Sequence, residues 1–240
     1  MTAPPAKPKE DASLAAYARI RHAEAQLKER LTEFALEMWG ESWFAEAVGT
    51  FYLDSEVPES VTEDPDFDLV FLPWLAFHFA PDPEAEDAPE GLNGQTMGEY
   101  FLAHHLEELS ALEEELLRAA GSSPFSFYQV VAATPGRSME LRDILTGRTF
   151  TIADRTRSAS CEPGSLVYGL VVGVAGLWVQ IGLGHDRIPP TYETRILDFR
   201  NSCLASRPLT DDELVRYQDD IRGFYLDLLQ KLRKPAPRRS

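Results

Sequence analysis

The chain has 240 residues, of which 44% are hydrophobic, and this length is sufficient for one large core or two small ones. The net charge is −16, but residues 31–117 contain 22 acidic residues and no Lys or Arg, whereas the rest carries 23 basic and 17 acidic residues. Such an acidic half disfavours binding to nucleic acid or anionic membranes and could attract a basic protein partner. Acidic side chains that only solvate helices explain the same pattern.

The N-terminal half is predicted to be helical. Residues 1–10 are polar and rich in Pro and Lys, and we expect a disordered leader there. Apolar residues then recur with helical spacing over 11–39, and an aromatic-rich helix follows a break at 39–42. Residues 54–64 are acidic and are expected to form a loop.

Three further helices complete an acidic helical region that we assign to 11–122. The segment 64–82 begins with Asp-Pro, a favoured helix start, and Pro73 is expected to bend or end this helix. Helices are also predicted at 97–108 and 111–120, because each follows a capping box whose two side chains satisfy free backbone N–H groups. The two boxes run from Thr96 to Glu99 and from Ser110 to Glu113.

A β-rich block follows these helices. "FSFYQVVAA" alternates like a strand, and "SMELRD" and "RTFTIA" are two further strands joined around "ILTG", where Gly147 supplies a positive φ. "EPGS" at 162–165 is a turn that leads into a long uncharged run. Five hairpin-connected strands within 123–190 predict a small antiparallel β-barrel or curved sheet of the SH3-like or OB-like kind.

The uncharged run "SLVYGLVVGVAGLWVQIGLG", residues 165–184, is long enough to cross a membrane as a helix. If it folds back at Ala175-Gly176 instead, its large apolar side chains share one face, and Trp178 lies opposite Gly173 on the other face. A helix gives no reason for this sorting, and the many valines and glycines suit a helix poorly. We therefore predict a β-hairpin, no membrane span and a cytoplasmic protein.

The C-terminal part is predicted to return to helix. A helix is expected at 191–205, and a Thr-Asp-Asp-Glu capping box opens a last helix at 211–233. We expect both helices, within 191–233, to pack back on the β-block, and the basic tail at 234–240 to be disordered. The predicted fold class is α+β, with a helical N-terminal half, a five-stranded barrel and C-terminal helices.

Several stretches between residues 65 and 190 resemble a family of uncharacterised bacterial proteins. They are "FLPWLAFHFAPD", "GEYFLAHHLEELSALEEELLRA", "FSFYQVVAATPGRSMELRDILTGRTFTI", "RSASCEPGSLVYGLVV" and "IPP". Many members of that family end in a SEC-C motif, a short Cys/His zinc cluster also found at the end of the SecA translocation ATPase. This chain departs from the pattern, because it ends in "KPAPRRS" and has Ser165 where the family often has Asp. The resemblance implies a fold but neither a zinc site nor a catalytic residue.

We find no nucleophile or cofactor motif in the sequence, so no catalytic or cofactor-binding residue is assigned. Pairs of His and Glu at i, i+3 in one predicted helix have the spacing of helix-borne metal ligands, and they would suggest a cryptic metal-dependent hydrolase. Surface charge pairs along a helix explain the same spacing. The residues concerned are Glu99, His104, His105 and Glu108, with His78 and Glu113 as further donors.

An interaction surface is predicted on the β-block, where arginines and a tryptophan lie on or near the strands. A face of this kind could contact a protein partner, and arginines with aromatic rings also bind single-stranded nucleic acid. The block is only weakly basic, which favours a protein partner over nucleic acid. The leading hypothesis is a non-enzymatic interaction module, and a nucleic-acid-associated protein is the alternative. The surface residues are Arg137, Arg142, Arg148, Arg155, Arg157 and Trp178.

Overall fold

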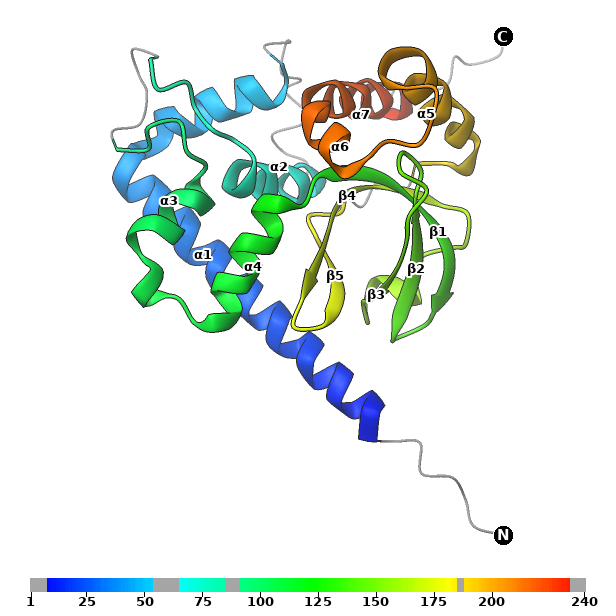
Figure 1. The fold of residues 1–240 in the computed structure, drawn as a ribbon, viewed down its shortest axis with the longest axis horizontal. Coiled ribbons are helices and arrows are strands. Elements are labelled where there is room, and N and C mark those ends of the chain that lie inside the picture. Colours follow the sequence, from blue (N-terminus) through cyan, green and yellow to red (C-terminus); the bar gives the residue numbers. More distant parts are fainter. Residues whose placement is uncertain (1–7, 54–64, 85–90, 185–187, 234–240) are drawn as a thin grey trace.

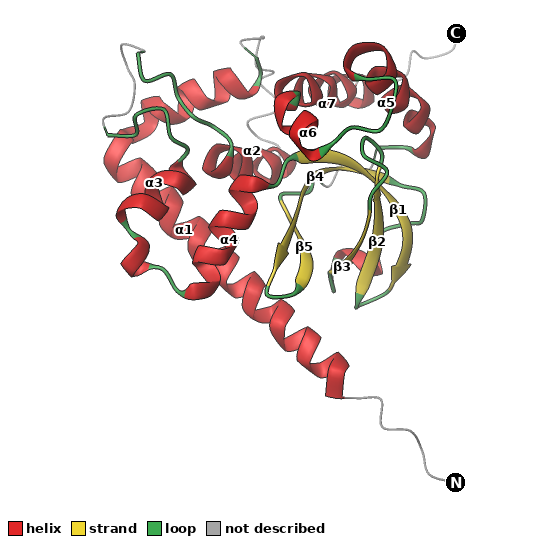
Figure 2. Ribbon diagram, viewed as in Figure 1, coloured by secondary structure: helices red, strands yellow, loops and turns green. Residues whose placement is uncertain are grey.

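The computed structural model describes residues 8–53, 65–84, 91–184 and 188–233. Figures 1 and 2 show an α+β fold in which N-terminal helices lie on one side, a closed five-stranded barrel lies beside them, and C-terminal helices lie across the barrel. One apolar core joins these parts, because it contains buried residues from both sets of helices and from three of the strands.

The N-terminal helices include one long helix with a kink. Gly40 has a φ of 74° and a ψ of −174°, and the chain changes direction there (Figure 1), which confirms the predicted break at 39–42. The first helix begins at Pro8, so 8–10 are helical and not part of a leader, whereas 1–7 lie outside the described residues. The elements are α1 (Pro8–Phe51), α2 (Pro65–Phe77), α3 (Met97–His104), the 3-10 turn η1 (Leu106–Glu108) and α4 (Ala111–Ser122).

Helix α2 continues past Pro73 and ends only at Phe77. Proline has no N–H, so the carbonyl of Leu69 loses the hydrogen bond that it would accept in a regular helix. Gly182 covers this point, because a Cβ on Gly182 would lie only 2.6 Å from the Leu69 carbonyl oxygen. The chain after β5 therefore packs directly on the turn of α2 that the proline interrupts. The loop expected at 54–64 lies outside the described residues.

The capping boxes predicted for α3 and α4 are confirmed. The Thr96 hydroxyl accepts from the N–H of Glu99 at 3.2 Å, and the Glu99 carboxylate accepts from the N–H of Thr96 at 2.8 Å. Ser110 and Glu113 make the same two hydrogen bonds, at 3.3 and 2.8 Å. The helix predicted for 97–108 is divided, because α3 ends early and η1 follows as a separate turn.

The five strands close into a barrel in the order β1-β2-β3-β5-β4. The prediction of a purely antiparallel barrel is wrong for one pair, since β3 and β5 are parallel and paired only at Ile152 and Trp178. After β3 the chain crosses over to place β4 beside β1, and the hairpin from β4 then brings β5 back along β3 in the same direction. The strands are β1 (Phe125–Thr134), β2 (Ser138–Asp143), β3 (Thr149–Ala153), β4 (Leu166–Val174) and β5 (Leu177–Ile181).

The hairpin predicted for 165–184 is confirmed, with β4 and β5 joined at a turn in which Ala175 and Gly176 have φ values of 50° and 74°. Among the described helices, none has the length and apolar character needed to cross a membrane. The cross-strand pairs are Val174 with Leu177, Gly173 with Trp178, Val172 with Val179 and Leu170 with Ile181.

The two faces of β4 enter different clusters of buried side chains. Val167 and Val171 pack with residues of β1, β2 and β3 in a small cluster that fills the barrel. Leu170, Val172 and Val174 face the other way and belong to the large core that the barrel shares with the helices. The bulky face of the hairpin is therefore the outer surface of the barrel, and helices cover it.

The C-terminal helices pack on the barrel, where the ring of Tyr225 stacks on that of Tyr168 with 4.1 Å between centroids. The last predicted helix, 211–233, is divided at Tyr217, although the capping box at its start is confirmed. The tail at 234–240 lies outside the described residues. The elements are η3 (Pro190–Tyr192), α5 (Glu193–Phe199), the π-helical turn η4 (Arg200–Leu204), α6 (Asp211–Arg216) and α7 (Gln218–Arg233).

Candidate functional site: an arginine groove beside the barrel

The four helix residues considered as metal ligands have other contacts. The Glu99 carboxylate completes the capping box of α3, and His105 Nδ1 lies 2.9 Å from Glu108 Oε1. His104 is exposed, and its ring packs on Tyr100 with 4.5 Å between centroids. Within the described ranges, no group of three or more His, Cys, Asp or Glu side chains is arranged to hold a metal ion.

The two further donors, His78 and Glu113, lie in different surroundings. Glu113 Oε1 accepts a hydrogen bond from Arg30 of α1 at 2.9 Å. His78 follows α2, its ring packs edge-on against Phe125, and its Nε2 atom is buried without a hydrogen-bond partner. Burial, reinforced by the positive charge of Arg222, lowers the pKa of His78 to about 4.

The structure divides the residues predicted to form one interaction surface among three places. Arg142 is already engaged, because it donates to Glu193 Oε1 at 2.5 Å and to Gln129 Oε1 at 2.7 Å, which ties β2 to β1 and α5. The others lie at the two ends of β3. Arg148 lies at its start, and Arg137, Arg155 and Arg157 lie at its end. Trp178 pairs with Ile152 near the end of β3, but its ring packs on Phe150 and lines the same pocket as Arg148.

A pocket of about 130 Å³ lies at the start of β3, and we call it the aromatic pocket. Trp178 stands at its rim with 40% of its surface exposed, and its ring lies 5.0 Å from that of Phe150. The Arg148 guanidinium lies over the Phe150 ring at 5.1 Å and donates to both carboxylate oxygens of Asp211 at 2.6 Å. The lining includes Tyr128, Asp143, Arg148, Phe150, Val171, Trp178 and Asp211.

At the end of β3 the chain turns at Asp154, which is buried. Its Oδ1 accepts from the N–H of Arg157 at 2.8 Å, and its Oδ2 accepts from the side chain of Gln180 at 2.7 Å. These bonds hold the start of the 3-10 turn η2 (Arg157–Ala159) against β5. As a result, Arg155 and Arg157 leave the barrel next to α1.

Helix α1 supplies the facing wall. Arg21 donates to the backbone carbonyl of Gln180 at 2.8 Å and to Glu24 at 2.5 Å, which joins the helix to β5. Tyr17 is buried one turn earlier, and burial raises the pKa of its hydroxyl although Arg21 acts in the opposite direction. The backbone of Arg155 also hydrogen-bonds to Tyr17, so the wall of α1 and the turn after β3 contact each other directly.

A groove of about 810 Å³ lies between these two walls, and we call it the arginine groove. Its lining has three arginines and one aspartate, hence a formal charge of +2 within a chain of charge −16. Arg157 donates to the carbonyl of Leu183 at 2.6 Å, whereas the exposed Arg155 guanidinium has no hydrogen-bond or ion-pair partner among the described residues. The lining consists of Leu14, Tyr17, Ala18, Arg21, Gly136, Asp154, Arg155, Thr156 and Arg157.

The groove is suited to binding an anion. Guanidinium groups bind carboxylates and phosphates through paired hydrogen bonds, and their charge persists at any physiological pH. The lining has no Ser, Cys or His, and its buried Asp154 already accepts hydrogen bonds through both oxygens. The arrangement therefore supports recognition of an acidic group better than catalysis on it.

The α1 residues of the groove were not identified from the sequence. Leu14, Tyr17, Ala18 and Arg21 follow the i, i+3, i+4, i+7 spacing of one helix face, a signal that could have marked this face as partly apolar and partly basic. No local pattern connects that face with Arg155, because the two segments meet only through packing of the barrel against α1.

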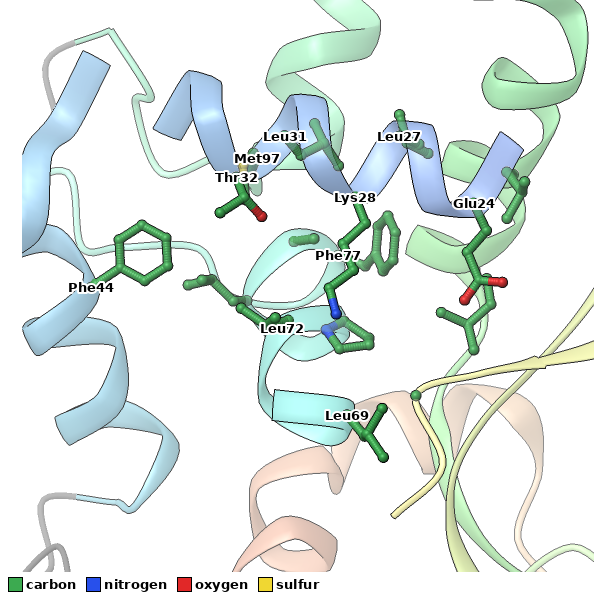
Figure 3. A pocket seen from close by; sticks show the side chains of 16 residues that line it. Glu24, Leu27, Lys28, Leu31, Thr32, Phe44, Leu69, Leu72, Phe77 and Met97 are labelled. Atoms are coloured by element: carbon green, nitrogen blue, oxygen red, sulfur yellow. The ribbon is translucent and has the colours of Figure 1, made fainter. Parts of the chain in front are cut away.

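A third pocket lies among the N-terminal helices and is smaller, at about 80 Å³. Figure 3 shows Glu24 and Lys28 of α1 extending toward α2, with Phe77 beside Lys28 and Leu72 farther along α2. Burial raises the pKa of Glu24, and Arg21 and Lys28 partly oppose this effect. The remaining lining is mostly apolar, so this pocket offers few polar groups that could orient a ligand.

Comparison with known proteins bears on the central part of the chain. Residues 90–185, which include α3, α4 and all five strands, match the family of unknown function DUF7986. No curated protein and no solved structure matches the chain. The matched part contains Arg155 and Trp178 but not Arg21 or Asp211. Over this part the chain is similar to an uncharacterised family, and that similarity assigns no activity to either site.

Proposed function

We propose that the protein is a non-enzymatic interaction module that binds an acidic segment of a partner protein in the arginine groove. The convergence of Arg21, Arg155 and Arg157 from two distant segments carries this proposal. The groove, at about 810 Å³, falls within the size range of ligand sites and can accommodate several side chains of a peptide. Arg155 has no ion-pair partner in the described part of the chain, so its guanidinium can bind a carboxylate without first leaving one of these residues.

The negative charge of the whole chain does not prevent such binding. At physiological ionic strength the Debye length is about 8 Å, so exposed charges farther away than this are largely screened. An acidic segment in the groove interacts mainly with its three arginines, while the acidic residues of 31–117 disfavour binding of the same segment elsewhere. The charge pattern thus favours one site over the rest of the surface.

The alternatives receive less support from the geometry. Single-strand binding combines basic side chains with aromatic rings on which bases stack, but Trp178 lines the aromatic pocket and Arg155 lines the arginine groove. For a metal-dependent hydrolase, Glu99 and His105 would have to leave the contacts that they make within their own helical segment. We therefore build the proposal on protein recognition.

The test is a fluorescence anisotropy titration of a labelled hexaglutamate peptide with the full-length protein at several salt concentrations. We expect binding at 50 mM salt that weakens as salt increases, because screening reduces the attraction. Arg155→Glu is expected to weaken binding by about tenfold or more, which corresponds to about 1.4 kcal/mol.

The matched control is Arg118→Glu, which makes the same change of charge on the exposed face of α4. It should change the affinity by less than about twofold, because Arg118 lies outside the groove. Equal losses in the two variants would mean that only net charge matters and would contradict the proposal. An oligo(dT) arm is included, and tighter binding of oligo(dT) with the same dependence on Arg155 would favour a nucleic-acid partner.

A cytoplasmic location is part of the same proposal. Cys161 and Cys203 are both thiols, which suits a reducing compartment. We also propose a relation to bacterial proteins that carry a C-terminal SEC-C motif. This relation adds no residue to the groove. Fractionation of the native host cells, with the protein detected by antibody, would test the location.

A further inference from the structure

The aromatic pocket at the start of β3 is a second site, separate from the arginine groove. The indole of Trp178 covers Gly173, since a Cβ on Gly173 would lie 3.2 Å from the ring, yet 40% of the tryptophan surface remains exposed. Behind it, Phe150 and Tyr128 form an edge-to-face pair with 6.2 Å between ring centroids. The pocket therefore has one exposed indole, with two largely buried aromatic rings behind it.

A cation already lies in this pocket. The Arg148 guanidinium lies over the face of Phe150, and its Nη1 atom donates to both carboxylate oxygens of Asp211. Attraction of a cation to the negative face of an aromatic ring is strongest for tryptophan, and the exposed ring of Trp178 lies next to Phe150. Arg148 thus occupies a position between the Phe150 ring and the Asp211 carboxylate, and the Trp178 ring lies beside it.

The charges at the pocket favour a cation over an anion. The lining contains Asp143 and Asp211 against the single positive charge of Arg148, which leaves a formal charge of −1. Outside the lining, Glu115 of α4 places a further carboxylate at the β4–β5 turn, where it accepts a hydrogen bond from the N–H of Ala175 at 2.8 Å. A phosphate or carboxylate would be repelled here, and a basic group would be attracted.

We infer that the aromatic pocket binds the guanidinium or methylated ammonium head of a basic side chain on a partner protein, and that Arg148 occupies this position in the free protein. The side chains of Arg148 and Asp211 are 47% and 62% exposed, so their ion pair is well solvated and an incoming cation can replace it at little cost. The empty space beside Arg148 is about 130 Å³, so the site suits a single head group and not a whole peptide. This site does not depend on the arginine groove.

The experiment observes the indole N–H signals of the four tryptophans by NMR, with the Trp178 signal assigned from Trp178→Phe. The probes are methylguanidinium and tetramethylammonium chloride, added at constant ionic strength against sodium chloride. We expect a saturable shift of the Trp178 signal only. An Arg-containing tripeptide should shift it as well, whereas the same tripeptide with Gln should not.

Two variants test whether the probes bind at the position of Arg148 beside Trp178. Arg148→Ala should bind the probes about threefold to tenfold more tightly, because the internal competitor is gone, and Trp178→Ala should lose about tenfold or more. The matched control is Arg195→Ala on α5, which breaks a comparable exposed ion pair with Asp227 and should change nothing. The remaining tryptophan signals report whether each variant is folded.

Three results would overturn the inference. One is the lack of a saturable shift with any cationic probe. Another is weaker binding of the probes by Arg148→Ala. That result would mean that Arg148 helps to bind the ligand, as it would for a base or a neutral ring stacked on the guanidinium. The third is tighter binding of adenosine than of methylguanidinium. None of these results affects the hexaglutamate assay, so the two sites are tested independently.

Discussion

Gly182 packs directly against Pro73 at the point where α2 lacks a hydrogen bond. A Cβ on Gly182 would lie 2.6 Å from Pro73 Cγ and 2.6 Å from the carbonyl oxygen of Leu69, the acceptor that Pro73 leaves without its donor. Gly182 also has a φ of 65°, which side chains disfavour. The end of β5 and the broken turn of α2 therefore fit each other only because this residue is glycine.

Gly182→Ala is expected to reduce the free energy of unfolding by about 3 kcal/mol or more, because the methyl group must displace backbone and proline atoms. Urea denaturation followed by circular dichroism measures this loss. The matched control is Gly176→Ala, since Gly176 has a φ of 74° but nothing within 4 Å of its Cβ position. The control should lose only about 1 kcal/mol. Equal losses would show that the close approach to α2 is not important.

Stability should fall in acid because of His78. Its pKa is lowered to about 4 by burial and, second, by Arg222, against 6.5 in the unfolded chain. The unfolded state therefore binds the proton more readily than the folded state. Because of this, the stability of the folded state is fully retained above pH 6.5 and decreases as the pH falls from 6.5 to 4. The total loss is about 3 kcal/mol. Denaturation at a series of pH values measures it.

His78→Phe keeps a ring against Phe125 and removes the titrating group. Carboxylates also titrate over this pH range. The informative quantity is therefore the difference in the free energy of unfolding between wild type and variant. The wild type should lose stability relative to the variant as the pH decreases from 6.5 to 4. A constant difference across this range would show that His78 does not titrate as described.

Arg222 packs on two aromatic rings and also binds the Thr50 carbonyl and Asp219, and we expect its packing to contribute most to stability. Its side chain is buried and its guanidinium lies 4.6 Å from the ring centroid of Trp74 and 5.7 Å from that of Phe51. Arg222→Ala should lower the free energy of unfolding by about 2 to 4 kcal/mol. Arg222→Met keeps the apolar stem and should lose less than about 1.5 kcal/mol. If the Met variant were as unstable as the Ala variant, the charge and not the packing would be responsible.

The capping boxes of α3 and α4 should differ in their contribution to stability. Glu113 is buried and binds both Ser110 and Arg30 of α1, so Glu113→Ala should cost about 2 kcal/mol. Glu99 is exposed and caps only its own helix, so Glu99→Ala should cost about 0.5 to 1 kcal/mol. Thermal unfolding of both variants gives the comparison. A larger loss for Glu99→Ala would contradict the role given to Arg30.

Features that depend on neighbouring residues were predictable from the sequence. The alternation of large side chains determines the β4–β5 hairpin with Trp178 opposite Gly173, and short-range hydrogen bonds determine the capping boxes. The kink at Gly40 follows from a glycine at a helix break. Each of these features involves residues that are close along the chain, so their patterns can be read without knowledge of the rest of the fold.

What only the tertiary structure decided is how distant segments meet. Ile152 and Trp178 pair in parallel because the barrel closes, and Gly182 packs on the turn of α2 that Pro73 interrupts. Likewise, Arg21 and Arg155 form one groove although they are 134 positions apart in the sequence. Such contacts are selected by the burial of apolar surface across the whole molecule, and no local pattern carries that information.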